Sequence, residues 1–276
     1  MKKIVNIIII LLVLGLSVFF TMKTIEKKYA GNAPKSNNTT TQTTEYVTTT
    51  QTTEEIPADT GASTEETTEA QPVDKIDSSD PDFPKVFDLE LELIEQFPEL
   101  PAGCEAVSLT MILNYYGFDL DKEYIIDNYQ VFSDNFVLGY CGDPYSPTTG
   151  GGCYAPGMTD TANNFLKDKG SELRAKNITG TEFEDLFEYV AAGKPVLVWT
   201  TMGMGPSSKG YYQYDNLGNA YAWDNMEHCV VLAGYDIAAN TVSIYDPMEG
   251  FVYRDIDAFK TSYESMYKMA IILKEY

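Results

Sequence analysis

The sequence predicts an α+β fold for residues 81–276, and three observations lead to that prediction. Helix-like segments come first and strand-like segments follow, an order typical of α+β domains rather than of alternating α/β ones. One helix-like segment, residues 105–116, is apolar around nearly its whole circumference and so belongs inside a core. Aromatic residues make up 13% of the chain, far more than a chain that stays unfolded would carry.

Residues 1–30 are predicted to be a membrane anchor. Residues 4–22 carry no charged side chain, and about 20 apolar residues suffice to span a bilayer. Lys2 and Lys3 precede this run, as in a signal peptide or in an anchor whose N-terminus stays inside the cell. Because no small-residue cleavage site follows the run, an uncleaved anchor is favoured over a removed signal peptide. The domain beyond it is expected to be extracellular, held at the cell membrane or secreted if the segment is cleaved.

Residues 31–80 are predicted to be a disordered linker. Nearly half of residues 39–68 are Thr and hardly any is apolar. Such a segment cannot bury enough surface to offset the entropy that folding would cost. Residues 81–276 then form one domain, which is long enough for a single hydrophobic core.

The chain is strongly acidic, with 41 Asp and Glu against 19 Lys and Arg and a formal charge of -22. We expect no nucleic-acid partner, because phosphate contacts depend on Lys and Arg. An acidic domain suits a cationic substrate instead.

The elements expected within the domain follow from hydrophobic periodicity and from turn residues. Apolar and acidic residues alternate over residues 87–94, which predicts a half-buried strand leading into the buried helix that Gly117 ends. Residues 132–158 are rich in Gly and predict a functional loop, since loops this long inside a compact domain usually have a function. Further helices are expected at 120–129, 159–169 and 181–192, and further strands at 196–200, 228–235, 241–246 and 269–273.

The four cysteines are Cys104, Cys141, Cys153 and Cys229. Cys141 and Cys153 bracket the Gly-rich loop, and a disulfide between them is expected to stabilise the fold by about 3 kcal/mol through loop entropy. The chain has no CxxC and one His, too few for the usual zinc ligand sets, so neither a metal nor a cofactor is expected. Cys229 follows His228 in an expected strand, where neighbours point to opposite faces, so we expect it in the core.

Cys104 stands at the N-terminus of the buried helix, where the helix dipole favours a thiolate. A small buried hydrophobic residue is the alternative interpretation, because free cysteines often pack that way. His228, the only histidine, can serve as the base for such a thiol, although it could also be a structural residue. Asp246 can hold the imidazole, and the amide of Gln96 can stabilise an oxyanion.

The spacing of the later strands predicts that His228 and Asp246 meet. If the two strands form a hairpin in which Tyr235 pairs with Thr241, His228 lies opposite Met248. Asp246 is then its diagonal neighbour on the same face, about 7–8 Å away at the backbone and within side-chain reach. A slip of one residue would put the two side chains on opposite faces.

Several segments form a recognisable set: QFPELPAGCEA (96–106), LNYYG (113–117), GDP (142–144), YAP (154–156), GKPV (193–196), HCVVL with GYD (228–236), and YDP with Gly250 (245–250). This set resembles the papain-like cysteine peptidases, and within them the bacteriocin-processing (double-glycine leader) peptidases. The resemblance implies a fold in which a central helix carrying the nucleophile packs on an antiparallel sheet. It also implies that Cys104 is the nucleophile and His228 the base, with Asp246 orienting the base and Gln96 donating to the oxyanion.

The expected function is therefore that of a membrane-tethered extracellular cysteine peptidase. It would hydrolyse an amide bond of a peptide or protein substrate through a Cys-His-Asp triad and a cysteinyl acyl-enzyme. A transamidase or a peptidoglycan-type amidase would use the same residues, because amine and water attack the same kind of intermediate. A catalytically inactive surface binding module of the same fold is a further interpretation. No obligate protein partner is expected.

Overall fold

The computed structural model describes residues 75–276. The predicted anchor, residues 1–30, and residues 31–74 of the predicted linker lie outside the described residues. The prediction is wrong for the end of the linker, because Lys75 Nζ pairs with Glu188 and Ser78 Oγ donates to the same carboxylate at 2.7 Å. Within the described part of the chain, no helix combines the length and the apolar character that crossing a bilayer requires.

The elements of residues 75–276 are as follows. The helices are α2 (Cys104–Tyr115), α3 (Tyr124–Asn128), α4 (Ala155–Asp168), α5 (Leu186–Ala191) and α6 (Ile256–Ser265), with a short 3-10 turn η1 (Met202–Met204). The strands are β1 (Val86–Asp88), β2 (Leu173–Asn177), β3 (Val196–Thr201), β4 (Lys209–Tyr214), β5 (Ala220–Asp224), β6 (Glu227–Asp236), β7 (Thr241–Asp246), β8 (Gly250–Asp255) and β9 (Ala270–Glu275).

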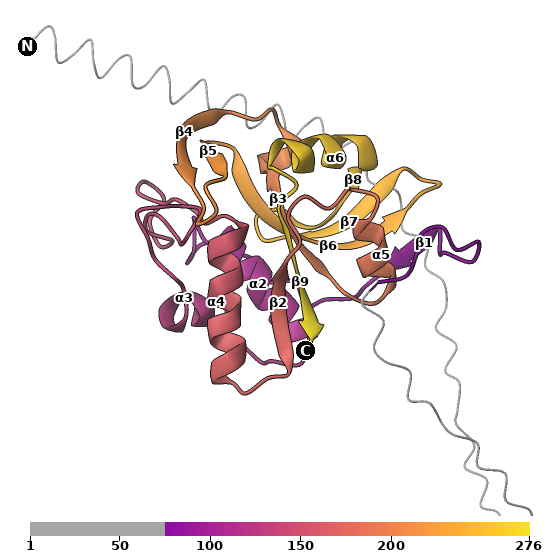
Figure 1. Ribbon diagram of the computed structural model, residues 1–276, viewed down its shortest axis with the longest axis horizontal. Helices are drawn as coiled ribbons and strands as arrows, with labels where there is room; N and C mark the ends of the chain where they lie inside the picture. The colour runs from indigo at the N-terminus through magenta and orange to yellow at the C-terminus, as the bar shows by residue number, and fades with distance from the viewer. Residues whose placement is uncertain (1–74) are drawn as a thin grey trace, which may run out of the picture. The chain divides into compact units, whose positions relative to one another are not determined.

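Most of the strands form one antiparallel sheet in the order β2-β9-β3-β6-β7-β8 (Figure 1). The long strand β6 lies at its centre. It pairs with β3 over its first half and with β1 near its end, while β7 lies along its other edge. The strands β4 and β5 form a separate hairpin.

Two cores lie on opposite faces of this sheet, because successive side chains of a strand point to opposite sides. Trp199, Cys229 and Val231 belong to the core that contains α2, α3 and α4. Val198 and Val230 belong to the core that contains α5 and α6. The α+β class predicted from the sequence is confirmed, and so is the expectation that Cys229 lies in the core.

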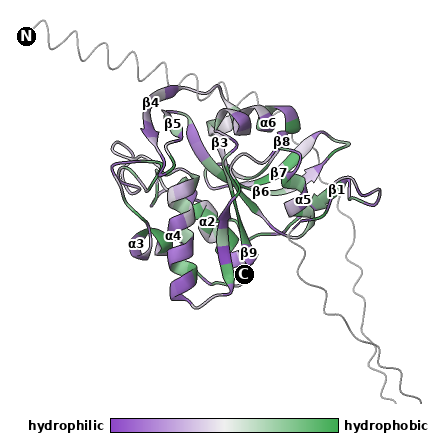
Figure 2. Ribbon diagram, in the orientation of Figure 1, coloured by the Kyte–Doolittle hydropathy of each residue, from purple (hydrophilic) through white to green (hydrophobic). Residues whose placement is uncertain are grey.

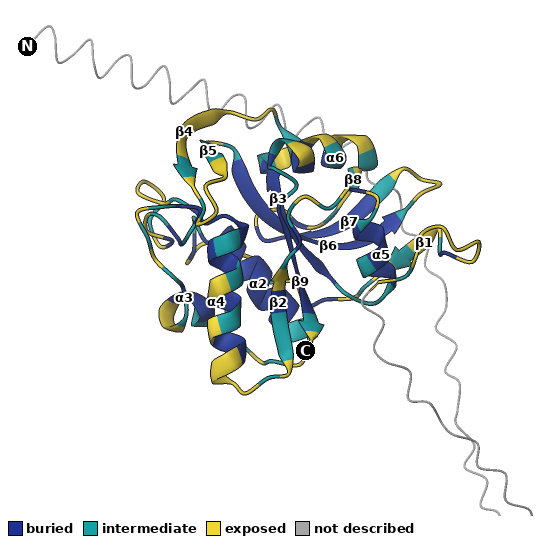
Figure 3. Cartoon of the chain, in the orientation of Figure 1, coloured by how far each residue is buried: buried dark blue, intermediate teal, exposed yellow. Residues whose placement is uncertain are grey.

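Helix α2 confirms the prediction of a buried central helix. All of its residues except the last two are buried, and it is largely hydrophobic along its length (Figures 2 and 3). Gly117 follows with a φ of 91°, a conformation that suits Gly and ends the helix where the sequence predicts. Ser108 Oγ donates to the carbonyl oxygen of Cys229 at 3.0 Å, which ties α2 to β6 close to the site.

Several elements differ from the sequence prediction. The first predicted strand is mostly irregular, and only β1 pairs with a neighbour. Helix α4 begins at Ala155, before the predicted start, because Pro156 suits the first turn of a helix. The strands β2, β4, β5 and β8 and the helix α6 have no counterpart in the prediction.

The predicted hairpin register is wrong next to the turn. Tyr235 pairs with Val242, one residue beyond the predicted Thr241. Farther along, Ala233 is an extra residue in β6, where the register with β7 shifts by one. Such a β-bulge lets two residues of one strand oppose one residue of the other.

Candidate active site

Cys104 is the first residue of α2 and is only 7% exposed. The N-terminus of α2 borders a cavity of about 290 Å³, which is lined by Cys104 together with Gln96 and His228. A larger hollow of about 500 Å³ lies beside β2 and β9 and is lined by none of these residues. Three of the four predicted site residues therefore meet at one cavity.

The fourth predicted residue, Asp246, lies directly behind His228. The bulge in β6 restores the predicted register, because Val231 pairs with Tyr245. Continued toward the start of β6, this pairing puts His228 opposite Met248. His228 Nε2 lies 2.8 Å from Asp246 Oδ1, and the two side chains are 2% and 0% exposed. The predicted pair is therefore formed, although the predicted register at the turn is wrong.

The Asp246 carboxylate is held by more than the imidazole. The backbone N–H groups of Met248 and Glu249 donate to its Oδ1 at 2.8 and 3.3 Å. Burial would raise the pKa of Asp246, but the hydrogen bond and charge of His228 and the two backbone donors outweigh burial and lower it. Because Asp246 is ionised, Nε2 is the ring nitrogen that donates to it. Nδ1 is then the ring nitrogen that can act as a base.

Gln96 links the segment before α2 to the loop after β7. Its backbone N–H donates to the carbonyl oxygen of Pro247 at 2.8 Å. Its side-chain Nε2 donates to the carbonyl oxygen of Pro101 at 3.1 Å. An amide nitrogen carries two donor hydrogens, so a second one remains for a group bound in the cavity.

One wall of the cavity comes from the Gly-rich loop, and it depends on the absence of side chains. A Cβ at Gly151 would lie 1.6 Å from the carbonyl oxygen of Cys141, and one at Gly150 would lie 2.4 Å from Ala102 Cβ. Both separations are far below van der Waals contact. The Tyr140 hydroxyl donates to the carbonyl oxygen of Ala102, and this hydrogen bond holds the loop next to the residues that precede Cys104.

The predicted disulfide between Cys141 and Cys153 is not formed, and both are free thiols. Cys141 forms an antiparallel bridge with Gly152, so the next residue, Cys153, points to the opposite face. Cys153 is fully buried, and its thiol donates to the carbonyl oxygen of Tyr154 at 3.5 Å. Hydrogen bonds rather than a cross-link therefore hold this loop.

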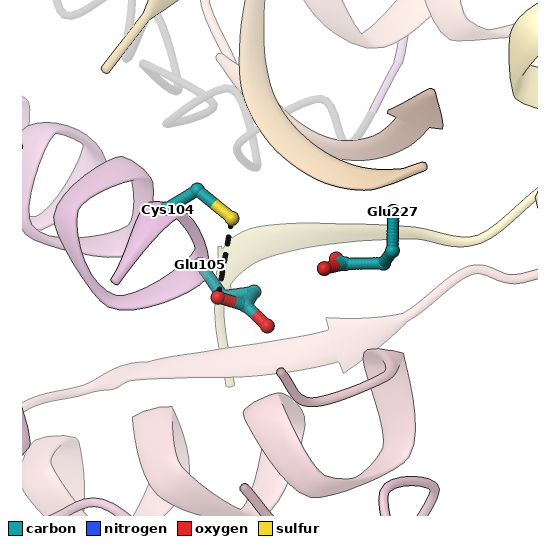
Figure 4. Close-up of side chains that lie close together, drawn as sticks. All are labelled: Cys104, Glu105 and Glu227. Atoms are coloured by element: carbon teal, nitrogen blue, oxygen red, sulfur yellow. Dashed lines mark hydrogen bonds between the residues drawn. The ribbon is translucent and has the colours of Figure 1, made fainter. Parts of the chain in front are cut away.

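Two buried carboxyl groups beside Cys104 were missed by the sequence reasoning. Glu105 Oε2 accepts a hydrogen bond from Cys104 Sγ at 3.3 Å, and Glu227 faces the same place from the start of β6 (Figure 4). The other oxygen of Glu105 accepts from the backbone N–H of Cys153. The available signal was position, because one glutamate follows Cys104 in the chain and the other precedes His228.

These carboxyl groups change the acidity of the site. Burial raises the pKa of Glu105 to about 6, against the opposing effect of its hydrogen bonds. Burial, and then the charges of Glu105 and Asp224, raise the pKa of Glu227 well above its usual range. Burial, and then the two glutamates, raise the pKa of the Cys104 thiol as well. The thiol therefore needs a base to ionise near neutral pH.

Comparison with known proteins places these features in a family context. A model of the Peptidase_C39 like family matches residues 88–271 of this chain. The uncharacterized protein YvpB of Bacillus subtilis (strain 168) is 26% identical over 196 residues, which cover 64% of this chain and 71% of YvpB.

The solved structures of two other proteins also align with this chain. A candidate C39-like peptidase from Bacillus anthracis aligns with a TM-score of 0.60 at 28% identity, covering 69% of this chain and 98% of that one. A double glycine motif protease from an AMS/PCAT transporter, solved in complex with the leader peptide, aligns with a TM-score of 0.41 at 22% identity, covering 69% and 95%. The Bacillus anthracis alignment and the packing of α2 on the antiparallel sheet confirm the predicted papain-like fold.

Proposed function

The chain belongs to the Peptidase_C39 like family, and from that membership we propose that it is a cysteine peptidase that hydrolyses an amide bond of a peptide or protein. Cys104 is the nucleophile, His228 the base, Asp246 the residue that orients the base, and Gln96 the oxyanion donor. One observation carries the proposal. A buried imidazole, with Nε2 held 2.8 Å from a carboxylate, lines the same cavity as a cysteine at a helix N-terminus.

In the first step, Cys104 Sγ gives its proton to the Nδ1 atom of His228. Because its surroundings raise the pKa of the thiol, the proton leaves as the sulfur attacks the substrate carbonyl carbon. Asp246 stabilises the imidazolium that forms, since its carboxylate accepts from Nε2.

The tetrahedral intermediate carries its negative charge on the former carbonyl oxygen. The free amide hydrogen of Gln96 and the backbone N–H of Cys104, in the first turn of α2, are the donors for that oxygen. When the intermediate collapses, the C–N bond breaks and the leaving amine takes the proton from His228. Water then attacks the thioester with His228 as base, which releases the acid and restores the thiol.

We also propose that residues 1–30 anchor the peptidase in the cell membrane and that residues 31–74 form a flexible linker, which ends where Lys75 and Ser78 bind Glu188 of the domain. Support comes from the uncharged apolar run and from the Thr-rich composition. The catalytic domain then works outside the cell.

Thiol alkylation tests the catalytic pair. Iodoacetamide should label Cys104 near neutral pH, and His228→Ala should slow that labelling at least tenfold, because the thiol loses its base. Peptide mapping distinguishes labelling at the four cysteines. Cys153 and Cys229 are fully buried, and Cys141, which is half-buried, serves as the internal reference. Equal rates at Cys104 in both proteins would favour a binding module without catalysis.

Peptide-library cleavage by the full chain, with Cys104→Ala as the inactive control, tests the reaction itself. Addition of an amine acceptor separates the two acyl-transfer outcomes. A hydrolase yields free acids in its presence, whereas a transamidase yields amides, and mass spectrometry distinguishes the products.

A further inference from the structure

Cys104, Glu105 and Glu227 form a compact cluster of metal-ligating groups. One ligand atom from each lies within 4.8 Å of the other two. Figure 4 shows the carboxyl group of Glu227 pointing toward the carboxyl group of Glu105, which lies next to the thiol. Helix α2 supplies two of the groups and the first residue of β6 supplies the third, so rigid elements hold the cluster.

The cluster contains an unsatisfied acceptor. Glu227 is 9% exposed, and its Oε1 has no hydrogen-bond partner among residues 75–276. A buried carboxyl oxygen without a partner costs free energy, and a bound cation would remove that cost. The proposed hydrolysis uses neither Glu227 nor Glu105, so it does not account for their placement.

The backbone leaves room between the two carboxyl groups. A Cβ at Gly152 would lie 2.7 Å from Glu105 Oε1 and 2.9 Å from Glu227 Oε2. A residue with a side chain at position 152 would therefore occupy the space between the carboxyl oxygens of Glu105 and Glu227. Glu227 and Cys104 also line the 290 Å³ cavity, which gives an ion a path from solvent.

We propose that Cys104, Glu105 and Glu227 bind one Zn²⁺ ion that reversibly masks the thiol. Calcium and magnesium prefer shells made only of oxygen, whereas zinc accepts thiolate and carboxylate ligands together. With typical zinc bond lengths, tetrahedral ligand atoms lie roughly 3.3–3.7 Å apart. The Cys104–Glu105 separation of 3.3 Å already fits, and Glu227 needs to move by about 1 Å at most.

Binding exchanges the thiol proton for the metal. The S–H bond breaks, the sulfur keeps the electron pair and donates it to Zn²⁺, and the proton goes to solvent. Water from the cavity takes the fourth position. A sulfur that donates to zinc cannot attack a carbonyl group. The loss of activity, though not the binding, rests on the proposed role of Cys104 as nucleophile.

Direct binding to the full chain tests the site without any assay of activity. Competition with a chromophoric chelator should give one Zn²⁺ per chain, and Co²⁺ should produce the near-ultraviolet absorption of a thiolate–cobalt bond. Cys104→Ser should abolish that absorption, and Glu227→Gln should weaken zinc binding at least tenfold. Glu172→Gln removes the same charge from an exposed position and should bind zinc like the wild type.

Glu227→Gln replaces a buried acid by a neutral group of the same shape, and circular dichroism checks that it folds. Zinc should slow alkylation of Cys104 at least tenfold in the wild type but not in Glu227→Gln, and a chelator should restore the rate. The proposed site would be overturned by absence of the cobalt absorption, or by equal zinc affinity in Glu227→Gln and wild type. Glu105 and Glu227 would then share a proton instead of a metal ion. Zinc binding by a chain that cleaves no peptide would instead refute the peptidase and keep the site.

Discussion

At Asp246, burial and hydrogen bonding change the pKa in opposite directions. Its carboxylate is fully buried, yet its pKa is lowered because one imidazole and two backbone N–H groups stabilise its charge. The same contacts that would orient His228 during catalysis therefore also stabilise the fold. A charged acceptor in such a hydrogen bond contributes more than a neutral one.

Asp246→Asn is expected to lower the free energy of unfolding at pH 7 by about 1–3 kcal/mol, because the charged acceptor is lost. The pKa of Asp246 lies lower in the folded state than in the unfolded state. Its stabilising effect is therefore complete above the unfolded value, near 3.8, and is lost as the pH falls through the folded value. Urea unfolding of the full chain at pH 7, 5 and 3 should show the difference from wild type shrinking at the lowest pH.

Asp119→Asn is the matched control, since that side chain is exposed, and it should leave the unfolding free energy unchanged across this range. A wild-type advantage over Asp246→Asn that is as large at pH 3 as at pH 7 would contradict the electrostatic explanation.

At this scale the sequence singles out the residues that stand in familiar patterns. Cys104 and His228 stand out as a helix-start cysteine and the only histidine. Glu105 and Glu227 do not stand out, because an acid in a sequence this acidic is expected on the surface. Only the fold reveals that both are buried beside the thiol.

Among the elements, the Gly-rich loop decides the shape of the cavity. Its glycines allow contacts that no side chain would permit, with the nearest backbone atom 1.6 Å from a Cβ built at Gly151. The predicted disulfide would have fixed the loop by a cross-link, whereas the structure fixes it by close backbone packing and hydrogen bonds. The loop is therefore sensitive to added atoms rather than to reduction.

Gly151→Ala is expected to displace the loop from the mouth of the cavity and to lower kcat/KM at least tenfold, because misplaced positioning groups cost catalysis steeply. Gly210→Ala is the control, since its Cβ would meet its nearest neighbour at 3.5 Å, an ordinary contact. Peptide hydrolysis and the alkylation rate of Cys104 both measure the effect. If Gly151→Ala matches Gly210→Ala in both, the loop does not shape the site.

Elements with strong periodicity were predictable and irregular ones were not. The buried strands β3, β6 and β7 and the helix α2 have continuous or periodic apolar patterns, and each was found. The hairpin β4–β5 lacks such a pattern, because nearly all of β4 is exposed and the buried residues of β5 are Ala222 and Asp224. The bulge at Ala233 also escaped prediction, since one extra residue leaves no mark in the apolar pattern of a strand that is buried on both faces.

For the whole molecule, the proposed linker, residues 31–74, sets the reach of the peptidase. A flexible chain of that length spans about 40 Å root-mean-square. The catalytic domain would then meet substrates close to the external face of the cell membrane. The distance of the domain from the membrane therefore depends on residues 1–74, which lie outside the described residues.

Expression of the full chain and of a form without residues 1–30 in a bacterial host tests this arrangement. The full chain should sediment with membranes, and protease added to intact cells should remove its domain, because about 20 apolar residues hold it in the bilayer. The truncated form should remain in the soluble fraction of lysed cells. If expression of the full chain instead releases into the medium a protein that is shortened at its N-terminus, the segment is a cleaved signal.

The formal charge of -22 leads to a prediction about substrates. A strongly acidic protein attracts cationic peptides and repels anionic ones, and salt screens both effects over about 10 Å at 0.1 M. Two peptides that share one cleavable sequence but carry flanking Lys or flanking Glu should therefore differ. We expect kcat/KM to favour the Lys peptide at least tenfold at 0.05 M salt, and the ratio to fall severalfold at 0.5 M. A neutral peptide should show little change with salt and serves as the control. A ratio that does not depend on salt would place the preference in local contacts of the cavity, and a preference for the Glu peptide would refute electrostatic attraction altogether.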